Sequence, residues 1–181
     1  MATQSLTERP AAVTMRGAPK TLVGPELHAG ASAPPFVLIG EGLAPFSLDD
    51  ALDGGKRAAL LIVVPSLDTP TCHREALTFH RRLADLPAGI AAFVVSVDLP
   101  FAQARWAKAN EAEGLIYLSD YRDRSFGTAY GVLVKEPLIL ARATFVVDPS
   151  KKLTYASVVP EIADEPNYDE IFAAAKRAAG T

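Results

Sequence analysis

Two continuous apolar runs constrain the fold of this chain more than any other feature. Ala58–Val64 and Ile90–Val97 contain no charged residue and are rich in β-branched side chains, which is typical of strands buried on both faces of a sheet. Each run precedes a segment with helical spacing of apolar residues, at about 70–86 and 101–113. This alternation predicts an α/β fold with a central, mixed but mostly parallel sheet flanked by helices on both faces.

The second half of the chain continues this alternation and ends in a hairpin and a helix. Gly131 follows a short helical stretch and is expected to cap its C-terminus. The Asp148-Pro149 turn separates two β-rich stretches, which predicts a hairpin. The predicted elements are a strand at Leu115–Leu118, a helix at Ser125–Tyr130, strands at Ala143–Val147 and Leu153–Val159, and a helix at Tyr168–Ala179.

Composition excludes several classes of function. With 49% hydrophobic and 22% charged residues, the chain of 181 residues has a globular composition. Its length predicts a single domain over residues 13–181, after a flexible lead-in at 1–12. A net charge of −3 indicates no nucleic-acid partner. The longest central apolar run is too short to span a bilayer, and residues 1–10 lack the apolar core of a secretory signal, so we expect a cytoplasmic protein without membrane contact.

The chain has one cysteine, Cys72, so it can form neither an intrachain disulfide nor a Cys-rich zinc site. Cys72 follows Thr69-Pro70-Thr71 at the junction between an apolar run and a helical segment. Because proline is favoured at the first helical position, Thr69 is the predicted N-cap and Cys72 the third helical residue. Free backbone N–H groups and the helix dipole favour the nucleophilic thiolate at such a position.

Each residue of interest also has a purely structural interpretation. A lone cysteine is often a buried small hydrophobe. Thr69 can act only as a helix cap, Pro65 can simply end a strand, and Arg142 can be a surface arginine at the start of a strand. The individual residues leave both interpretations open.

Six short blocks, taken together, give the sequence a resemblance to a known family. The pattern Pro65-x-x-x-Thr69-x-x-Cys72 is that of the peroxiredoxins, and the surrounding blocks resemble the bacterial thiol peroxidase subfamily. They run in family order from about residue 13 to 178. The blocks are Thr21–Glu26, Pro65–Thr69, Ser96–Arg105, Ser119–Gly127, Leu140–Ala143 and Val159–Ile162.

The resemblance implies a thioredoxin-like fold with a short N-terminal β-hairpin near residues 13–23, and a peroxidase acting on hydrogen peroxide and organic hydroperoxides. Cys72 corresponds to the peroxidatic cysteine, which attacks the peroxide and becomes a sulfenic acid. Thr69 corresponds to the threonine whose hydroxyl contacts thiolate and peroxide, and Pro65 to the proline that shields the thiolate from water. Arg142 corresponds to the arginine that stabilises the thiolate and donates to the peroxide oxygens.

The chain departs from many thiol peroxidases because it has no resolving cysteine, whose position falls on Ala107. Regeneration therefore requires an external thiol, either of low molecular weight or from a thioredoxin- or glutaredoxin-like protein. Two alternatives stay open, a peroxide-sensing regulatory protein and a catalytically silent thioredoxin-like interaction module.

Similar proteins are homodimers that pack near the active site, so we expect a homodimer here. Neighbouring helical residues point in different directions, so His73 is predicted to be a surface or interface residue rather than a catalytic partner of Cys72. His73 and His80 lie two helical turns apart, about 10 Å along the axis, which is too far to share one ion. The sequence predicts neither a metal ion nor an organic cofactor.

Overall fold

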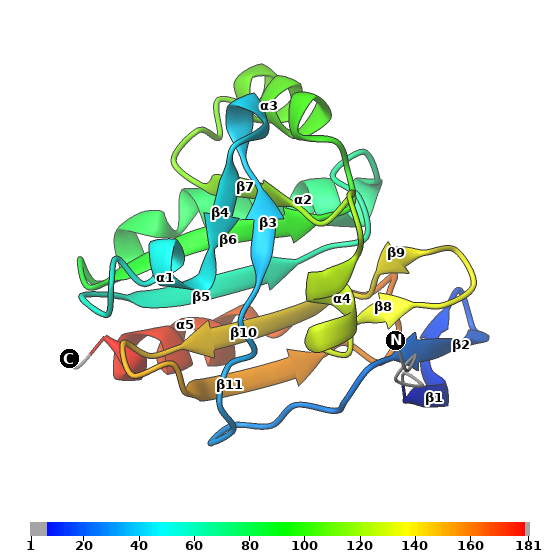
Figure 1. Cartoon of the computed structure of the whole chain (residues 1–181). Helices are drawn as coiled ribbons and strands as arrows, with labels where there is room; N and C mark the ends of the chain where they lie inside the picture. The colour runs from blue at the N-terminus through cyan, green and yellow to red at the C-terminus, as the bar shows by residue number, and fades with distance from the viewer. Residues whose placement is uncertain (1–6, 180–181) are drawn as a thin grey trace.

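A seven-stranded mixed sheet forms the centre of the computed structural model, which describes residues 7–179 (Figure 1). Its three middle strands are parallel to one another, whereas the outer pairs are antiparallel. Across the sheet, the strands are β11 (Leu153–Val158), β10 (Ala143–Val147), β5 (Ala58–Val63), β6 (Ile90–Ser96), β7 (Ile116–Ser119), β3 (Val37–Ile39) and β4 (Pro45–Ser47).

Helices cover both faces of this sheet (Figure 1). They are α1 (Leu48–Ala51), α2 (Pro70–Arg81), α3 (Pro100–Ala109), α4 (Ser125–Ala129) and α5 (Tyr168–Ala178), with 3-10 turns η1 (Glu41–Leu43) and η2 (Leu83–Asp85). Helices α2 and α5 pack on one face, and α1 and α4 on the other. Helix α3 packs against β7 and η1. Within residues 7–179, no helix has the length and apolar character that crossing a membrane requires.

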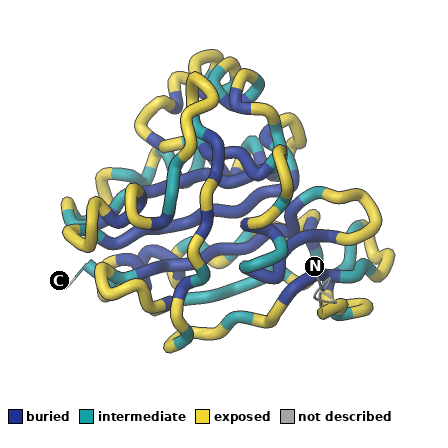
Figure 2. Tube along the Cα trace, viewed as in Figure 1, coloured by how far each residue is buried: buried dark blue, intermediate teal, exposed yellow. Residues whose placement is uncertain are grey.

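Strand β5 is buried along its whole length (Figure 2). Its alternate residues face two separate layers of the core. Leu60 and Ile62 belong to the apolar cluster that includes α2 and α5. Leu61 and Val63 belong to the cluster on the opposite face. This two-sided burial confirms the prediction from the continuous apolar run.

The predicted mixed α/β sheet is confirmed, but its parallel part is limited to the centre. Parallel neighbours need a crossover connection, which is usually a helix, and α2 and α3 supply such crossovers for β5, β6 and β7. Strand β10 instead pairs antiparallel with β5 and then forms the predicted hairpin with β11. Antiparallel pairs therefore outnumber parallel ones, unlike the expectation of a mostly parallel sheet.

A second, smaller sheet contains the predicted N-terminal hairpin. Its strands, in order, are β1 (Glu8–Met15), β2 (Ala18–Val23), β8 (Leu133–Val134) and β9 (Ile139–Leu140). The hairpin turns at Arg16 and Gly17, which both have positive φ (52° and 76°), as a type I′ turn requires. Because β1 begins at Glu8, the predicted lead-in is already part of a strand at residues 8–12. Residues 1–6 lie outside the described residues, and the single-domain organisation stays a prediction.

Two predicted helices end earlier than expected. Helix α2 ends at Arg81 and continues as the 3-10 turn η2. Helix α3 ends at Ala109, where the side chain of Asn110 donates to the Trp106 carbonyl at 2.8 Å and Glu111 has a positive φ of 51°.

Gly131 follows α4 with a φ of 65°, and a Cβ there would lie 1.7 Å from the Pro25 carbonyl oxygen, so this position requires glycine.

Candidate active site

Three segments that are distant in sequence meet at Cys72. They are the first turn of α2, the residues just before β10, and the segment between β11 and α5. Cys72 is the third residue of α2, as predicted. Its side chain is 1% exposed and lies in an apolar cluster with Leu67, Ala76 and Phe79. A thiolate in these surroundings needs charged or hydrogen-bonding partners.

The start of α2 supplies unpaired backbone amides. Thr69 has extended backbone angles (φ −119°, ψ 147°), and its carbonyl accepts from the His73 amide at 2.9 Å, so it is the N-cap. Its hydroxyl donates to the Ser66 carbonyl at 3.0 Å and does not cap the helix. Within residues 7–179, the amides of Thr71 and Cys72 donate to no partner. These amides and the helix dipole favour negative charge at this end of α2.

Arg142 is 2% exposed and directs its guanidinium at the same site. Its Nη2 lies 3.4 Å from Cys72 Sγ. Its Nε donates to the Ile162 carbonyl at 3.0 Å, and its Nη1 donates to the Glu75 carboxylate. The sulfur is therefore in an apolar cluster, but a buried cation reaches it directly.

Sequence reasoning did not identify Glu75, the acidic member of this cluster. Its side chain is fully buried, and its Oε1 has no hydrogen-bond partner in the described part of the chain. Burial raises the pKa of Glu75, although the charge and hydrogen bond of Arg142 oppose this shift. The available signal was its position, since Glu75 shares an otherwise apolar helix face with Cys72, Ala76 and Phe79.

The loop before Cys72 is anchored to the end of the neighbouring strand. Asp98, just beyond β6, accepts from the Ser66 hydroxyl at 2.7 Å and from the Leu67 amide at 2.8 Å. Pro65 is buried within this loop, two residues beyond the end of β5. These contacts fix the path of the chain into α2 and hence the direction of the Cys72 side chain.

The segment between β11 and α5 lies over the first turn of α2. The Thr71 hydroxyl donates to the Ala163 carbonyl at 3.2 Å, and Arg74 pairs with Glu165 at 3.0 Å. Glu165 also accepts from the Tyr168 hydroxyl at 2.6 Å. Together with the bond from Arg142 to Ile162, these contacts hold the segment over the buried sulfur.

A cavity of about 380 Å³ adjoins the loop that leads into Cys72. Its lining includes Ser66, Asp98 and Trp106, so it lies between this loop and α3. His73 contacts Trp106 edge to face, with ring centroids 5.4 Å apart, and no hydrogen bond joins His73 to the sulfur among the described contacts. Ala107, at the expected resolving position, is 4% exposed.

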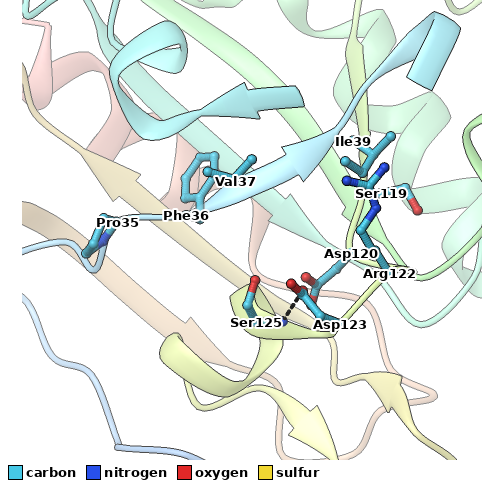
Figure 3. Close-up of a pocket in the computed structure, with 9 residues that line it drawn as sticks. All are labelled: Pro35, Phe36, Val37, Ile39, Ser119, Asp120, Arg122, Asp123 and Ser125. Atoms are coloured by element: carbon cyan, nitrogen blue, oxygen red, sulfur yellow. Dashed lines mark hydrogen bonds between the residues drawn. The ribbon is translucent and has the colours of Figure 1, made fainter. Parts of the chain in front are cut away.

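Another cavity, of about 360 Å³, lies at the junction between β7 and α4 (Figure 3). It is lined by Pro35, Phe36, Val37, Ile39, Ser119, Asp120, Arg122, Asp123 and Ser125. Asp120 accepts from the amides of Phe126 and Gly127 at 3.1 and 2.8 Å, while burial raises its pKa to about 6. The carboxylate at this junction is already paired with the helix, and none of the lining residues contacts Cys72 through a described hydrogen bond.

Of the four predicted site residues, the structure brings Cys72 and Arg142 into direct contact. Thr69 and Pro65 lie on the adjoining loop, but the Thr69 hydroxyl bonds to Ser66 and makes no hydrogen bond to the sulfur among the described contacts.

Comparison with known proteins defines the class. Residues 28–172 match the family model described as Redoxin. The crystal structure of a peroxiredoxin-like protein from Aquifex aeolicus is 39% identical, with a TM-score of 0.84 over 96% of this chain and 98% of that chain. A thiol peroxidase from Chromobacterium violaceum, 23% identical with a TM-score of 0.77 over 88% of this chain and 91% of that chain, shares the fold. The fold and the site thus define a member of the redoxin family.

Two curated relatives identify the group within the redoxin family to which the chain belongs. The thiol peroxidase of Clostridium acetobutylicum is 42% identical over 92% of this chain and 98% of its own length. The thiol peroxidase of Bacillus subtilis is 42% identical over 92% of this chain and 97% of its own length. Within the redoxin family, the chain belongs to the thiol peroxidases, as the six sequence blocks predicted.

Proposed function

We propose that this chain is a thiol-dependent peroxidase in which Cys72 reduces hydrogen peroxide and organic hydroperoxides. The observation that carries the proposal is the 3.4 Å contact between Arg142 Nη2 and Cys72 Sγ at the open N-terminus of α2. A guanidinium stays protonated at any ordinary pH and has several N–H donors. Thiol peroxidase relatives that match nearly the whole chain favour this activity over a sensor or an inactive module.

In the proposed reaction, the Cys72 thiolate attacks the terminal oxygen of the hydroperoxide. An S–O bond forms while the O–O bond breaks, so sulfur is oxidised by two electrons and the peroxide is reduced. The leaving oxygen takes up a proton and departs as water or an alcohol, and Cys72 becomes a sulfenic acid. Arg142 stabilises the thiolate beforehand and the charge on the leaving oxygen during the attack.

Thr69 and Pro65 complete the proposed site. Thr69 follows the anchored loop and already begins the helix that carries Cys72. We assign its hydroxyl to the bound peroxide, since a hydroxyl that donates to Ser66 still has an oxygen that can accept. Buried Pro65 has no N–H to attract water beside the reacting sulfur, which supports its assignment as a shield of the thiolate.

Regeneration is proposed to use two equivalents of an external thiol. The first forms a mixed disulfide with Cys72 and releases water, and the second releases the Cys72 thiol together with the oxidised reductant. Cys72 is the only cysteine in the sequence, so no intrachain disulfide can replace the mixed disulfide. A low-molecular-weight thiol and a thioredoxin- or glutaredoxin-like protein are the two proposed classes of reductant.

The proposed location of the protein is the cytoplasm.

The proposed assembly is a homodimer that packs near the active site. Leu99 and Phe101, at the start of α3, are 50% and 64% exposed. Apolar side chains of this size are suited to an interface core, and a second copy is the occupant we propose. Light scattering should give twice the chain mass for the wild type, and Phe101→Glu should shift it toward the monomer.

Rapid mixing with hydrogen peroxide tests the central proposal. Trp106 is the only tryptophan and contacts the ring of His73, which neighbours Cys72, so its fluorescence is expected to report oxidation. Mass spectrometry should find one added oxygen on Cys72, and a thiol should remove it over many turnovers. Cys72→Ser is the control and should abolish both signals. A wild-type Cys72 that does not react contradicts the proposal, and a single turnover that stalls with every thiol favours a sensor.

A further inference from the structure

The guanidinium of Arg142 is held by a different partner at each of its three nitrogens. Nε binds the Ile162 carbonyl, Nη1 binds Glu75, and Nη2 faces Cys72 Sγ. We propose that Glu75 is a positioning residue, whose carboxylate oxygen holds Nη1 so that Nη2 points at the reacting sulfur. This inference rests on the proposed peroxidase function and adds a fifth residue to its site.

Helix geometry explains why Glu75 can hold Arg142 without blocking the sulfur. Residues three positions apart lie on the same face of a helix, one turn from each other. Cys72 and Glu75 therefore approach the guanidinium from the same side of α2 and at different heights. A planar guanidinium presents N–H groups in a fixed fork, so fixing two of its edges also fixes the direction of the third.

Glu75 has little alternative role in the structure. It is fully buried, its Oε2 pairs with Arg142, and its Oε1 has no partner among the described residues. Buried ion pairs often contribute no net stability compared with well-packed apolar residues. A carboxylate placed at such a cost on an apolar helix face is better explained by what it does to Arg142 than by stability.

The other groups near Glu75 do not replace this contact. Glu165 and Tyr168, on the covering segment and α5, act on Glu75 only through their charge or are acted on by it. Their hydrogen bonds run to each other and to Arg74 instead. Glu165 therefore provides a matched control, as a carboxylate close to the site that does not hold the guanidinium.

The experiment is a double-mutant cycle on the rate constant for Cys72 oxidation by hydrogen peroxide. Glu75→Leu should slow the reaction by about 10²-fold, since a misplaced catalytic group has effects of this size. Glu75→Gln, which keeps an oxygen to accept from Nη1, should restore most of the rate. In an Arg142→Met background, Glu75→Leu should cause no further loss, because Glu75 acts only through Arg142.

Measurements of the free energy of unfolding distinguish a positioning role of Glu75 from a purely structural one. Each variant is unfolded in denaturant, and the double variant Glu75→Leu/Arg142→Met should be more stable than Arg142→Met alone, since it leaves no buried charge unpaired. Glu165→Leu should change the oxidation rate by less than about threefold, within the range of a weak surface charge effect.

Several results would overturn the inference. They are a Glu75→Leu rate equal to wild type, a Glu75→Gln rate as low as that of Glu75→Leu, or additive losses in the cycle. If instead wild-type Cys72 does not react with peroxide, the proposed function itself fails, so the two failures are distinguishable.

Discussion

The strand–helix junctions before α2 and α4 differ in whether a side chain pairs with the first backbone amides of the helix. Both helices begin with backbone amides that lack partners within the helix. At α4, Asp120 accepts from the amides of Phe126 and Gly127. At α2, no side chain caps the helix.

The uncapped amides at α2 show how the start of a helix can become a reactive site. A carboxylate that pairs with the amides stabilises the junction. The paired amides are then not available to bind another anion. The junction at α2 keeps that capacity, and Arg142 adds a positive charge beside Cys72. Loss of Arg142 should therefore affect chemistry most strongly, and changes at Asp120 should affect stability alone.

The largest expected effect follows from Arg142→Met. Removing a donor aimed at the reacting atoms should slow Cys72 oxidation by about 10²–10³-fold, as measured by rapid mixing with peroxide. Glu75 would be left buried without its partner, so the free energy of unfolding should fall by about 3–5 kcal/mol. An oxidation rate close to that of the wild type would remove Arg142 from the site and erase the contrast between the two junctions.

A smaller effect is expected from Thr69→Val, which keeps the size of the side chain and removes its hydroxyl. If the hydroxyl contacts the peroxide, the loss of one hydrogen bond of about 1.4 kcal/mol should slow oxidation about tenfold. Thr71→Val, two residues further along the chain and bonded to Ala163, is the control and should leave the rate nearly unchanged. Equal rates for Thr69→Val and wild type would mean that Thr69 serves only the backbone of α2.

The smallest effect on the reaction is expected at the α4 junction, where pH changes the stability of the fold and leaves Cys72 oxidation unaffected. Burial raises the pKa of Asp120 to about 6, so the folded chain holds this proton more tightly than the unfolded chain does. The resulting stabilisation is present below about pH 4 and is lost as the pH rises through about 6. Denaturant unfolding at pH 4 to 7 should therefore show the stability of wild type, relative to Asp120→Asn, falling by on the order of 1–3 kcal/mol.

The same titration has a kinetic control. Peroxide oxidation of Cys72 should be unchanged in Asp120→Asn, because Asp120 lies at a different junction and bonds to α4. A stability difference that is constant, or that rises with pH, would contradict the raised pKa of Asp120.

The sequence predicted the parts of the fold that carry long, regular patterns. The continuous runs at β5 and β6 and the hairpin of β10 and β11 are at or near their predicted positions. Strands β3, β4, β8 and β9 are only two or three residues long, so they are too short for an apolar period to be seen. They form because neighbouring strands pair with them, which is a tertiary effect.

In the candidate site, too, the local sequence predicts some residues, whereas others depend on tertiary structure. Cys72 and Thr69 are predictable because proline and threonine mark the start of a helix. Arg142 was identified through a family resemblance, since nothing in its own segment signals a partner 70 residues away. Glu75 was missed because a single charged residue on an amphipathic helix usually faces solvent, and only the tertiary structure shows that it is buried.

The near-complete burial of Cys72 affects its oxidation by peroxide and its reduction by a thiol to different degrees. A sulfur that is 1% exposed discriminates by the size of the reactant. Hydrogen peroxide needs far less displacement of the covering segment than a thiol carried on another protein. Under a steady supply of oxidant, we therefore expect reduction by a protein thiol to be slower than oxidation by hydrogen peroxide, so that the oxidised form accumulates.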